Sequence, residues 1–357
     1  MNAQCYKERS KGFLMNSMSA QELTVYTPSN GEWRQQSGDI WWSNREGGNS
    51  PDITRGPETF TTDEKFEVTE IPGAMSKMGW HKSAALLRKW FAYAPKNQAM
   101  NSFQKPHGIN RDGKTGVYPA DRFDKETIKL DWVLSYPRTQ SGFKNLQNSN
   151  YLSTNTRESL VSGVYPYRHR QRINTLDLVG GNIHALHNNF QFQYVKVDTS
   201  ALDKAAQFFG AMLRHGKPDD LAGALGGFAM YAAIAEATFT PLFIGGIEVS
   251  ITKVAIYVKN PYSFFDDPGE GGPQYLGHWN KDGICLVPEG FVAQKANWGS
   301  WSNYIIRPEG PHGRTFWPVH NSDFRRWQDA HNAGGDMVLF SDCRVVKIDP
   351  IRFRVMK

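Results

Sequence analysis

The C-terminal part of the chain gathers side chains that could carry out acid–base chemistry. His320, Asp323, Arg326, His331 and Asp336 lie close together along the sequence. An imidazole with nearby carboxylates can transfer protons, and guanidinium groups can stabilise the charge that develops on a phosphodiester. These residue types therefore predict a catalytic site for the hydrolysis of an anionic substrate.

A helix from about Ser322 to Asn332 is expected to position these groups. Ser322 is a suitable N-cap, and Gly334 is a suitable residue just beyond the helix end. Capping accounts for these two residues without any chemistry, so a hydrogen-bonded corner is the alternative to a catalytic site. Capping does not account equally well for His320 and Asp336, and both interpretations stay open.

Helical spacing places the side chains of this predicted helix on different faces. Phe324, Trp327 and His331 follow one another at spacings of three and four, so they share a face. This spacing favours a histidine packed in the core over a catalytic base at His331. Arg325 and Asp329 can form an i, i+4 pair, which is a weak surface contact.

A second group of residues could bind an anion. Arg168, His169, Arg170 and Arg172 follow two tyrosines in the segment Y-P-Y-R-H-R-Q-R, residues 165–172. Arginines beside stacking aromatic rings suit phosphates and unpaired bases. As a strand, the segment would place its three arginines on one face. A solvated edge strand, protected by charge from aggregation, is the alternative.

Two further motifs match known sites by pattern alone. Residues 108–115, G-I-N-R-D-G-K-T, fit a phosphate-binding loop, but no buried strand precedes them and glycine and proline disfavour a helix after them. We therefore favour a surface turn. His184 and His187 could share one side of a helix, but no cysteine or carboxylate follows at ligand spacing. We favour two polar residues in a loop and expect no metal site, and the sequence leaves the identity of any cofactor unknown.

The basic excess of the chain is mild. The 41 Lys and Arg residues oppose 35 Asp and Glu residues, which gives a net charge of +6 and a pI near 9.0. Such a charge favours anionic partners, namely nucleic acid, phosphate, an anionic lipid surface or an acidic protein. Cys5, Cys285 and Cys343 lie far apart, which argues against a disulfide framework and favours a reducing cytosol.

Segments that would direct the chain to or through a membrane are not expected. The N-terminus has no apolar stretch of the kind found in secretory signals. The longest stretch of low charge, residues 221–247, is interrupted by glycines and by Pro241, and Glu236 lies inside it. Because a membrane-spanning helix needs about 20 mostly apolar residues, we interpret this stretch as buried protein.

The hydrophobic patterns predict an α+β fold with a mainly antiparallel sheet and a few packed helices. Residues 71–91 and 200–213 have helical spacing, whereas residues 226–240 fit either a helix or a strand. Alternation predicts strands at residues 127–136, 190–197, 247–258, 274–279, 337–340 and 344–348.

The domain organisation follows from the change in composition along the chain. Residues 1–65 are polar and rich in turns, yet they contain Trp33, Trp41 and Trp42. A wholly disordered segment would rarely hold three tryptophans, so we expect an extended arm that docks them. Residues 66–357 form the α+β domain, which could be subdivided near residues 200–220.

Several segments together resemble the bacterial family catalogued as domain of unknown function 6402. They keep their order and cover about residues 66–350 of the chain. The quoted segments are I-P-G-A-M-S-K-M-G-W-H-K-S-A-A-L-L-R-K-W-F (71–91), L-D-W-V-L-S-Y-P-R (130–138), V-A-I-Y-V-K-N-P-Y-S-F (254–264), Y-L-G-H-W (275–279) and S-D-F-R-R-W-Q-D-A-H-N-A-G-G-D-M-V-L-F-S-D (322–342). The family has no assigned catalytic residues, and its members look like cargo of type VI secretion and phage-like loci.

The resemblance and the charge together predict a type VI secretion-associated effector, an antibacterial toxin that acts on an anionic target as a hydrolase or nuclease. Such cargo would be made in the bacterial cytoplasm and secreted without a signal peptide into a target cell. Its partners would be an immunity protein or a secretion spike protein, besides nucleic acid or another anionic target. Two alternatives stay open: a non-enzymatic adaptor on the spike, and a membrane-disrupting toxin that acts through residues 221–247.

Overall fold

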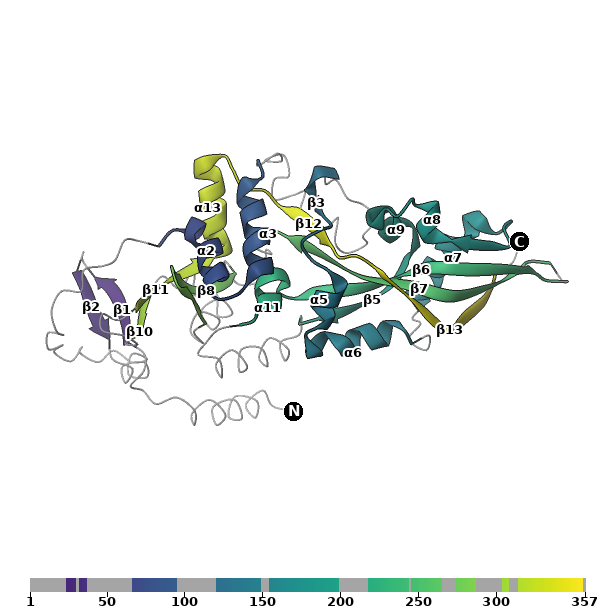
Figure 1. Cartoon of the computed structure of the whole chain (residues 1–357), viewed down its shortest axis with the longest axis horizontal. Coiled ribbons are helices and arrows are strands. Elements are labelled where there is room, and N and C mark those ends of the chain that lie inside the picture. The colour runs from purple at the N-terminus through teal and green to yellow at the C-terminus, as the bar shows by residue number, and fades with distance from the viewer. Residues whose placement is uncertain are drawn as a thin grey trace, which may run out of the picture. The chain divides into compact units, whose positions relative to one another are not determined.

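The computed structural model forms two compact units (Figure 1). One unit contains Met1–Ala74 and Asp266–Asp323, and the other contains Met75–Phe265 and Phe324–Lys357. The predicted arm and the predicted subdivision near residues 200–220 stay predictions. The structure describes residues 24–29, 32–36, 66–94, 120–148, 154–198, 218–243, 245–264, 274–286, 304–307 and 314–355. The predicted helix at 200–213 and the loop motif at 108–115 lie outside these residues.

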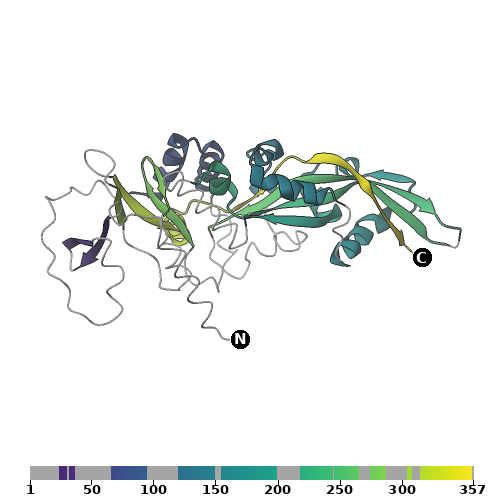
Figure 2. The same cartoon turned by 90° about the horizontal axis from the view of Figure 1, so that it is seen from below.

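The larger unit is built on a long antiparallel hairpin of β6 (Phe228–Pro241) and β7 (Ile247–Tyr262). Figures 1 and 2 show this hairpin as the central pair of the sheet. The alanine-rich segment at residues 226–240, for which the sequence fits either a helix or a strand, therefore forms a strand. Its alanines at positions 232, 233, 235 and 237 are buried, so small side chains cover this part of the sheet.

Other strands extend the hairpin on both sides. β5 (Gln191–Val197) and β4 (Arg172–Asn174) pair with β6. β12 (Met337–Phe340) and β13 (Arg344–Val355) pair with β7. Within the described part of this sheet, β3 (Phe123–Asp124) alone lies parallel to its neighbour, β12. The predicted α+β class with a mainly antiparallel sheet is confirmed, and β13 runs longer than the predicted strand.

The predicted helix at residues 71–91 is confirmed as two helices, α2 (Ile71–Lys77) and α3 (His81–Ala92). Gly79 separates them with a φ of 80°. The N-terminus of α3 is held by α11 (Asp220–Leu225), because the carboxylate of Asp220 accepts hydrogen bonds from the backbone N–H groups of Lys82 and Ser83. Such bonds satisfy amides that the first turn of a helix leaves unpaired.

The prediction of a strand at residues 127–136 is wrong. This segment contains α5 (Leu130–Leu134), and Pro137 begins α6 (Pro137–Leu146). Leu130 and Val133 are its buried residues, which is helical spacing. The carboxylate of Asp342 accepts the backbone N–H of Leu130 at 2.7 Å and so satisfies the first turn of α5.

Two other segments differ from expectation in the same unit. Residues 165–172 are not a strand: the 3-10 helix η4 (Tyr165–Tyr167) follows α7 (Thr154–Val164), and β4 begins only at Arg172. The loop favoured around His184 is a helix, α9 (Ile183–Phe190), which follows α8 (Thr175–Leu178). The side chain of Asn182 caps α9 by accepting two backbone N–H groups, which makes a helix of this polar segment.

The smaller unit contains an antiparallel sheet in the order β2-β1-β10-β11-β8-β9. The predicted strand at residues 274–279 is confirmed as β8, and the predicted C-terminal helix is confirmed as α13 (Asn321–His331), through which the division between the units passes. The strands are β1 (Thr24–Ser29), β2 (Glu32–Gln36), β8 (Tyr275–Asn280), β9 (Gly283–Cys285), β10 (Tyr304–Arg307) and β11 (Arg314–His320). Among the described residues, no helix is long and apolar enough to cross a bilayer.

Candidate functional site

Asp336, a predicted catalytic residue, belongs to a hydrogen-bonded corner. Its Oδ2 atom accepts hydrogen bonds from Arg325 Nη2 at 2.7 Å and from Ser263 Oγ at 2.8 Å. Its Oδ1 atom accepts the indole N–H of Trp90 at 3.1 Å. Both carboxylate oxygens are therefore engaged within the larger unit.

The same corner engages the rest of the Arg325 guanidinium. Its Nε atom donates to the carbonyl of Phe264 at 2.9 Å, and its Nη1 atom donates to Gln328 at 3.0 Å. Phe264, whose carbonyl accepts from Arg325, stacks on Phe324 with ring centroids 3.8 Å apart. The sequence assigned Arg325 to Asp329 by the i, i+4 rule, whereas its partner lies beyond the helix end. This arrangement matches the structural corner that was the alternative to a site.

His320 and Asp323 meet at the start of α13. The carboxylate of Asp323 accepts the backbone N–H of His320 at 2.7 Å, and its Oδ2 atom lies 3.7 Å from the Nδ1 atom of the His320 ring. This is half of a capping box, in which the third helical residue reaches back to the N-cap. The N-cap is therefore His320 and not the predicted Ser322, and Asp323, which the sequence had placed among the catalytic candidates, takes part in the cap.

The sequence missed two buried residues beside His320. Tyr275 lies opposite His320 in the pairing of β8 with β11, and their ring centroids are 5.8 Å apart. The hydroxyl of Tyr275 lies 2.5 Å from the Nδ1 atom of His278, whose side chain is completely buried. A histidine within an otherwise apolar strand was the available signal. These groups could pass a proton between them, but all three rings are buried.

Arg326 and His331 are exposed on the larger unit. The ring of His331 stacks on Trp327 with centroids 4.6 Å apart, and its Nδ1 atom lies 2.8 Å from the Trp327 carbonyl. The histidine shares a face with Trp327, as predicted, but it is not in the core. The structure pairs two of the predicted catalytic residues with each other, His320 with Asp323. A third, Asp336, pairs with Arg325, which was not among them.

A buried lysine, histidine and tyrosine form a second titratable group that the sequence missed. Lys259 Nζ lies 3.1 Å from His187 Nε2, and the Nδ1 atom of the same ring lies 2.8 Å from the Tyr257 hydroxyl. Burial, reinforced by the Lys259 ammonium, lowers the pKa of His187 to about 2. The neutral ring therefore accepts from Lys259 and donates to Tyr257. Burial also raises the pKa of Tyr257 well above its usual range.

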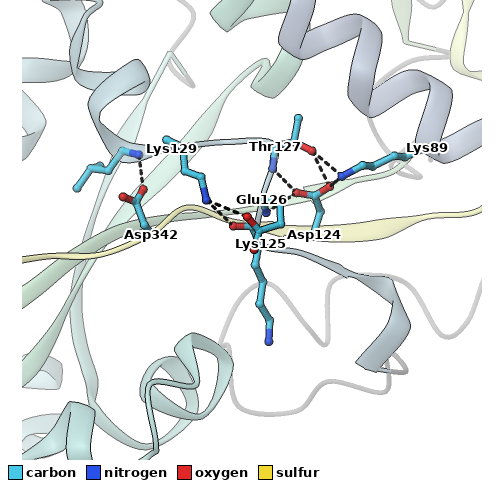
Figure 3. A network of polar contacts seen from close by, with 8 residues as sticks. Lys89, Asp124, Lys125, Glu126, Thr127, Lys129 and Asp342 are labelled. Carbon is cyan, nitrogen blue, oxygen red and sulfur yellow. Dashed lines mark hydrogen bonds and ion pairs between the residues drawn. The ribbon is translucent and has the colours of Figure 1, made fainter.

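A polar network joins α3 to the segment before α5 (Figure 3). Asp124 pairs with Lys89 and accepts the backbone N–H and the hydroxyl of Thr127 at 2.8 Å and 2.7 Å. Burial alone would raise the pKa of Asp124, but the hydrogen bonds from Lys89 and Thr127 outweigh it and hold this pKa below its usual value. The geometry is that of a structural clamp, and no group of His, Cys, Asp and Glu among the described residues could hold a metal ion.

The predicted anion-binding residues form an exposed turn of the larger unit. The guanidinium carbon of Arg168 lies 4.2 Å from the centre of the Tyr165 ring, and Arg170 lies 5.7 Å from that of Tyr167. His169, between these arginines, is exposed. The turn therefore presents two arginine–tyrosine pairs to solvent.

Arg172 has a different role from the other residues of this turn. It forms an ion pair with Glu236 on β6, whose carboxylate also contacts Lys253 and accepts a hydrogen bond from Thr252. The bond from Arg172 lowers the pKa of Glu236 to about 2. Arg172 thus attaches the turn to the sheet, while Arg168 is half-buried and Arg170 is exposed.

Comparison with known proteins finds one family. The model described as "Family of unknown function (DUF6402)" matches residues 66–355. No curated protein and no solved structure matches the chain. The family match therefore agrees with the resemblance seen in the sequence and assigns no role to any residue.

Proposed function

We propose that this chain, which belongs to the DUF6402 family of unknown function, is an antibacterial effector that binds a phosphate-bearing target. The exposed turn at residues 165–172 is the binding site in this proposal. The observation that carries it is the position of the Arg168 guanidinium over the Tyr165 ring and of the Arg170 guanidinium over the Tyr167 ring. The effector role is supported by the resemblance of the sequence to secretion-associated cargo.

The stacked arrangement suits phosphate for a physical reason. A guanidinium held against an aromatic ring keeps its N–H donors at its edge, where they can form paired bonds to phosphate oxygens. Stacking also fixes part of the side chain in advance, so less conformational entropy is lost on binding. His169 lies exposed between the two arginines.

The described residues support binding more directly than hydrolysis. The side chains of Tyr275 and His278 are buried, and the carboxylate of Asp336 accepts from three donors. A catalytic acid or base must reach a proton of the substrate. The proposal therefore takes binding of the target as its primary activity.

The test combines growth and binding. Wild-type protein is expressed in a bacterial host, directed to the cytoplasm and then to the periplasm, and its elution from phosphocellulose is measured in a salt gradient. The double variant Arg168→Gln/Arg170→Gln should abolish the growth defect and elute at lower salt. The control Arg157→Gln/Lys196→Gln removes the same charge from exposed positions elsewhere in the unit and should behave closer to wild type.

Two outcomes would contradict the proposal. One is an arginine double variant that inhibits growth and elutes like wild-type protein while keeping its thermal stability. The other is capture of a secretion spike protein by a chain that causes no growth defect in either compartment, which would favour the adaptor.

A further inference from the structure

The β6–β7 hairpin ends in an exposed apolar turn. The side chain of Phe243 is fully exposed, at 107%, and Leu242 beside it is partly exposed. Backbone hydrogen bonds of 3.1 Å join Leu242 to Gly245 and Gly246, both of which have positive φ. Figures 1 and 2 both show the hairpin reaching beyond the C-terminal strand β13. The fold therefore presents an aromatic ring at the end of this hairpin.

Basic residues lie on one side of the hairpin, in the turn that precedes the outer strand β4. The backbone N–H of Phe239, on the strand that leads to the tip, donates to the Gln171 carbonyl at 2.9 Å. The turn at residues 165–172, with the half-buried Arg168 and the exposed Arg170, is thereby fixed to the tip end of β6.

Further arginines lie on the opposite side of the hairpin. On β13, Arg354 is paired in register with Glu248 and Arg352 with Ser250, and both arginines are exposed. The acidic residues of β6 and β7 are Glu236, which Arg172 and Lys253 already bind, and Glu248. The end of the sheet thus combines an apolar tip with arginines on both sides.

We infer that the hairpin tip docks on an anionic lipid bilayer. Phe243 and Leu242 would enter the interface between headgroups and acyl chains, while the flanking arginines would contact lipid phosphates. This inference rests on the proposed function, because the turn at residues 165–172 serves as its phosphate-binding site, and it identifies the target as lipid.

The shape of the tip favours a bilayer over a protein partner. A specific protein interface buries at least about 1,000 Å² of surface, whereas one aromatic side chain supplies about 150–250 Å². A bilayer accepts a protruding tip without a matching pocket. Polar side chains of Thr240, Glu248 and Ser250, which are at least partly exposed, limit insertion to the tip.

The experiment measures flotation of the full chain with vesicles of phosphatidylcholine alone and with vesicles that also contain phosphatidylglycerol. Wild-type protein should float only with the anionic vesicles. Phe243→Ser should weaken that binding by about tenfold or more, which is the effect expected from exposing a phenylalanine ring. Tyr194→Ser is the matched control, because it removes another exposed aromatic ring of the same unit and should leave binding unchanged.

The arginine variants separate this inference from the proposed function. Arg352→Gln/Arg354→Gln should weaken flotation by about fivefold for each charge lost near the surface.

If Arg168→Gln/Arg170→Gln loses phosphocellulose binding while Phe243→Ser floats like wild type, the phosphate site stands and the lipid inference is overturned. If Phe243→Ser loses flotation while Arg168→Gln/Arg170→Gln keeps full phosphocellulose binding, the lipid surface stands and the proposed site fails. Equal binding to both vesicle types, or a Phe243-dependent dimer that does not bind vesicles, would also overturn the lipid inference.

Discussion

The Nη2 atom of Arg325 lies 2.7 Å from the Oδ2 atom of Asp336, and both side chains are partly shielded from solvent. The pair joins α13 to the segment that leads into β12. Removal of one partner would leave a shielded charge and several donors without their acceptor, which costs more than the net value of the bonds. The relationship therefore predicts a role in stability for a residue that the sequence had placed in a catalytic site.

Asp336→Ala is expected to lower the free energy of unfolding by about 1–3 kcal/mol. The reason is the loss of the acceptor for Arg325, Ser263 and Trp90. Urea unfolding followed by tryptophan fluorescence provides the measurement. Asp329→Ala, at an exposed position on the same helix, is the control and should change stability by less than about 0.5 kcal/mol. An Asp336→Ala protein with wild-type stability and no toxicity would restore the catalytic interpretation.

Stability should fall as the pH decreases below about 6.5, in part because of His187. Its folded pKa of about 2 lies below the ordinary value of 6.5, so between these values the unfolded chain binds one more proton than the folded chain. The contribution of His187 is complete above pH 6.5 and decreases by up to about 1.4 kcal/mol for each pH unit below it. The free energy of unfolding, measured from pH 7 to pH 4, should therefore decrease as the pH falls.

A variant isolates His187 from the other titrating groups. His187→Gln retains an acceptor for Lys259 but does not titrate, so its stability should depend less steeply on pH than that of wild type. His81→Gln, at an exposed position, should retain the wild-type slope. Parallel curves for wild type and His187→Gln would refute the assignment.

Local alternation predicted some strands and not others: β6 was left undecided between helix and strand, and β13 was predicted only over its first residues. β7 and β5 were identified, and so was the helix that begins after the turn at Gly79. The failure at residues 127–136 has a long-range cause. Leu130, Trp132 and Leu134 alternate as they would in a strand, whereas the structure buries Leu130 and Val133. The carboxylate that satisfies the first turn comes from Asp342, far along the chain. No local pattern contains that contact.

The candidate sites were limited in the same way. The i, i+4 rule assigned Arg325 to Asp329, whereas folding brings Asp336 back to it across a glycine turn. The neutral histidine between Lys259 and Tyr257 was not recognised because those residues come from a strand and His187 comes from a helix. The arginine–tyrosine contacts of residues 165–172 are local and could be expected from the sequence, whereas anion binding by these arginines stays a prediction.

Gly334 is expected to resist substitution because two constraints coincide there. Its φ is 90°, and a Cβ atom at this position would lie 2.7 Å from ring atoms of Trp90. Gly334→Ala should therefore lower the free energy of unfolding by about 1–3 kcal/mol more than Gly180→Ala does. Gly180 also has a positive φ, of 57°, but no atom lies within 4 Å of its added Cβ. The control thus carries the backbone strain without the clash.

A double-mutant cycle attributes the difference to the ring. Trp90→Phe removes the ring atoms nearest to Gly334, so Gly334→Ala should cost less in the Trp90→Phe background than in wild type. The coupling is expected to be about 0.5–3 kcal/mol, the range for residues in direct contact. Strictly additive costs would show that the clash is relieved elsewhere and that only the positive φ constrains this turn. Because Trp90 also donates to Asp336, the cycle is repeated with Asp336→Ala to separate the hydrogen bond from the steric contact.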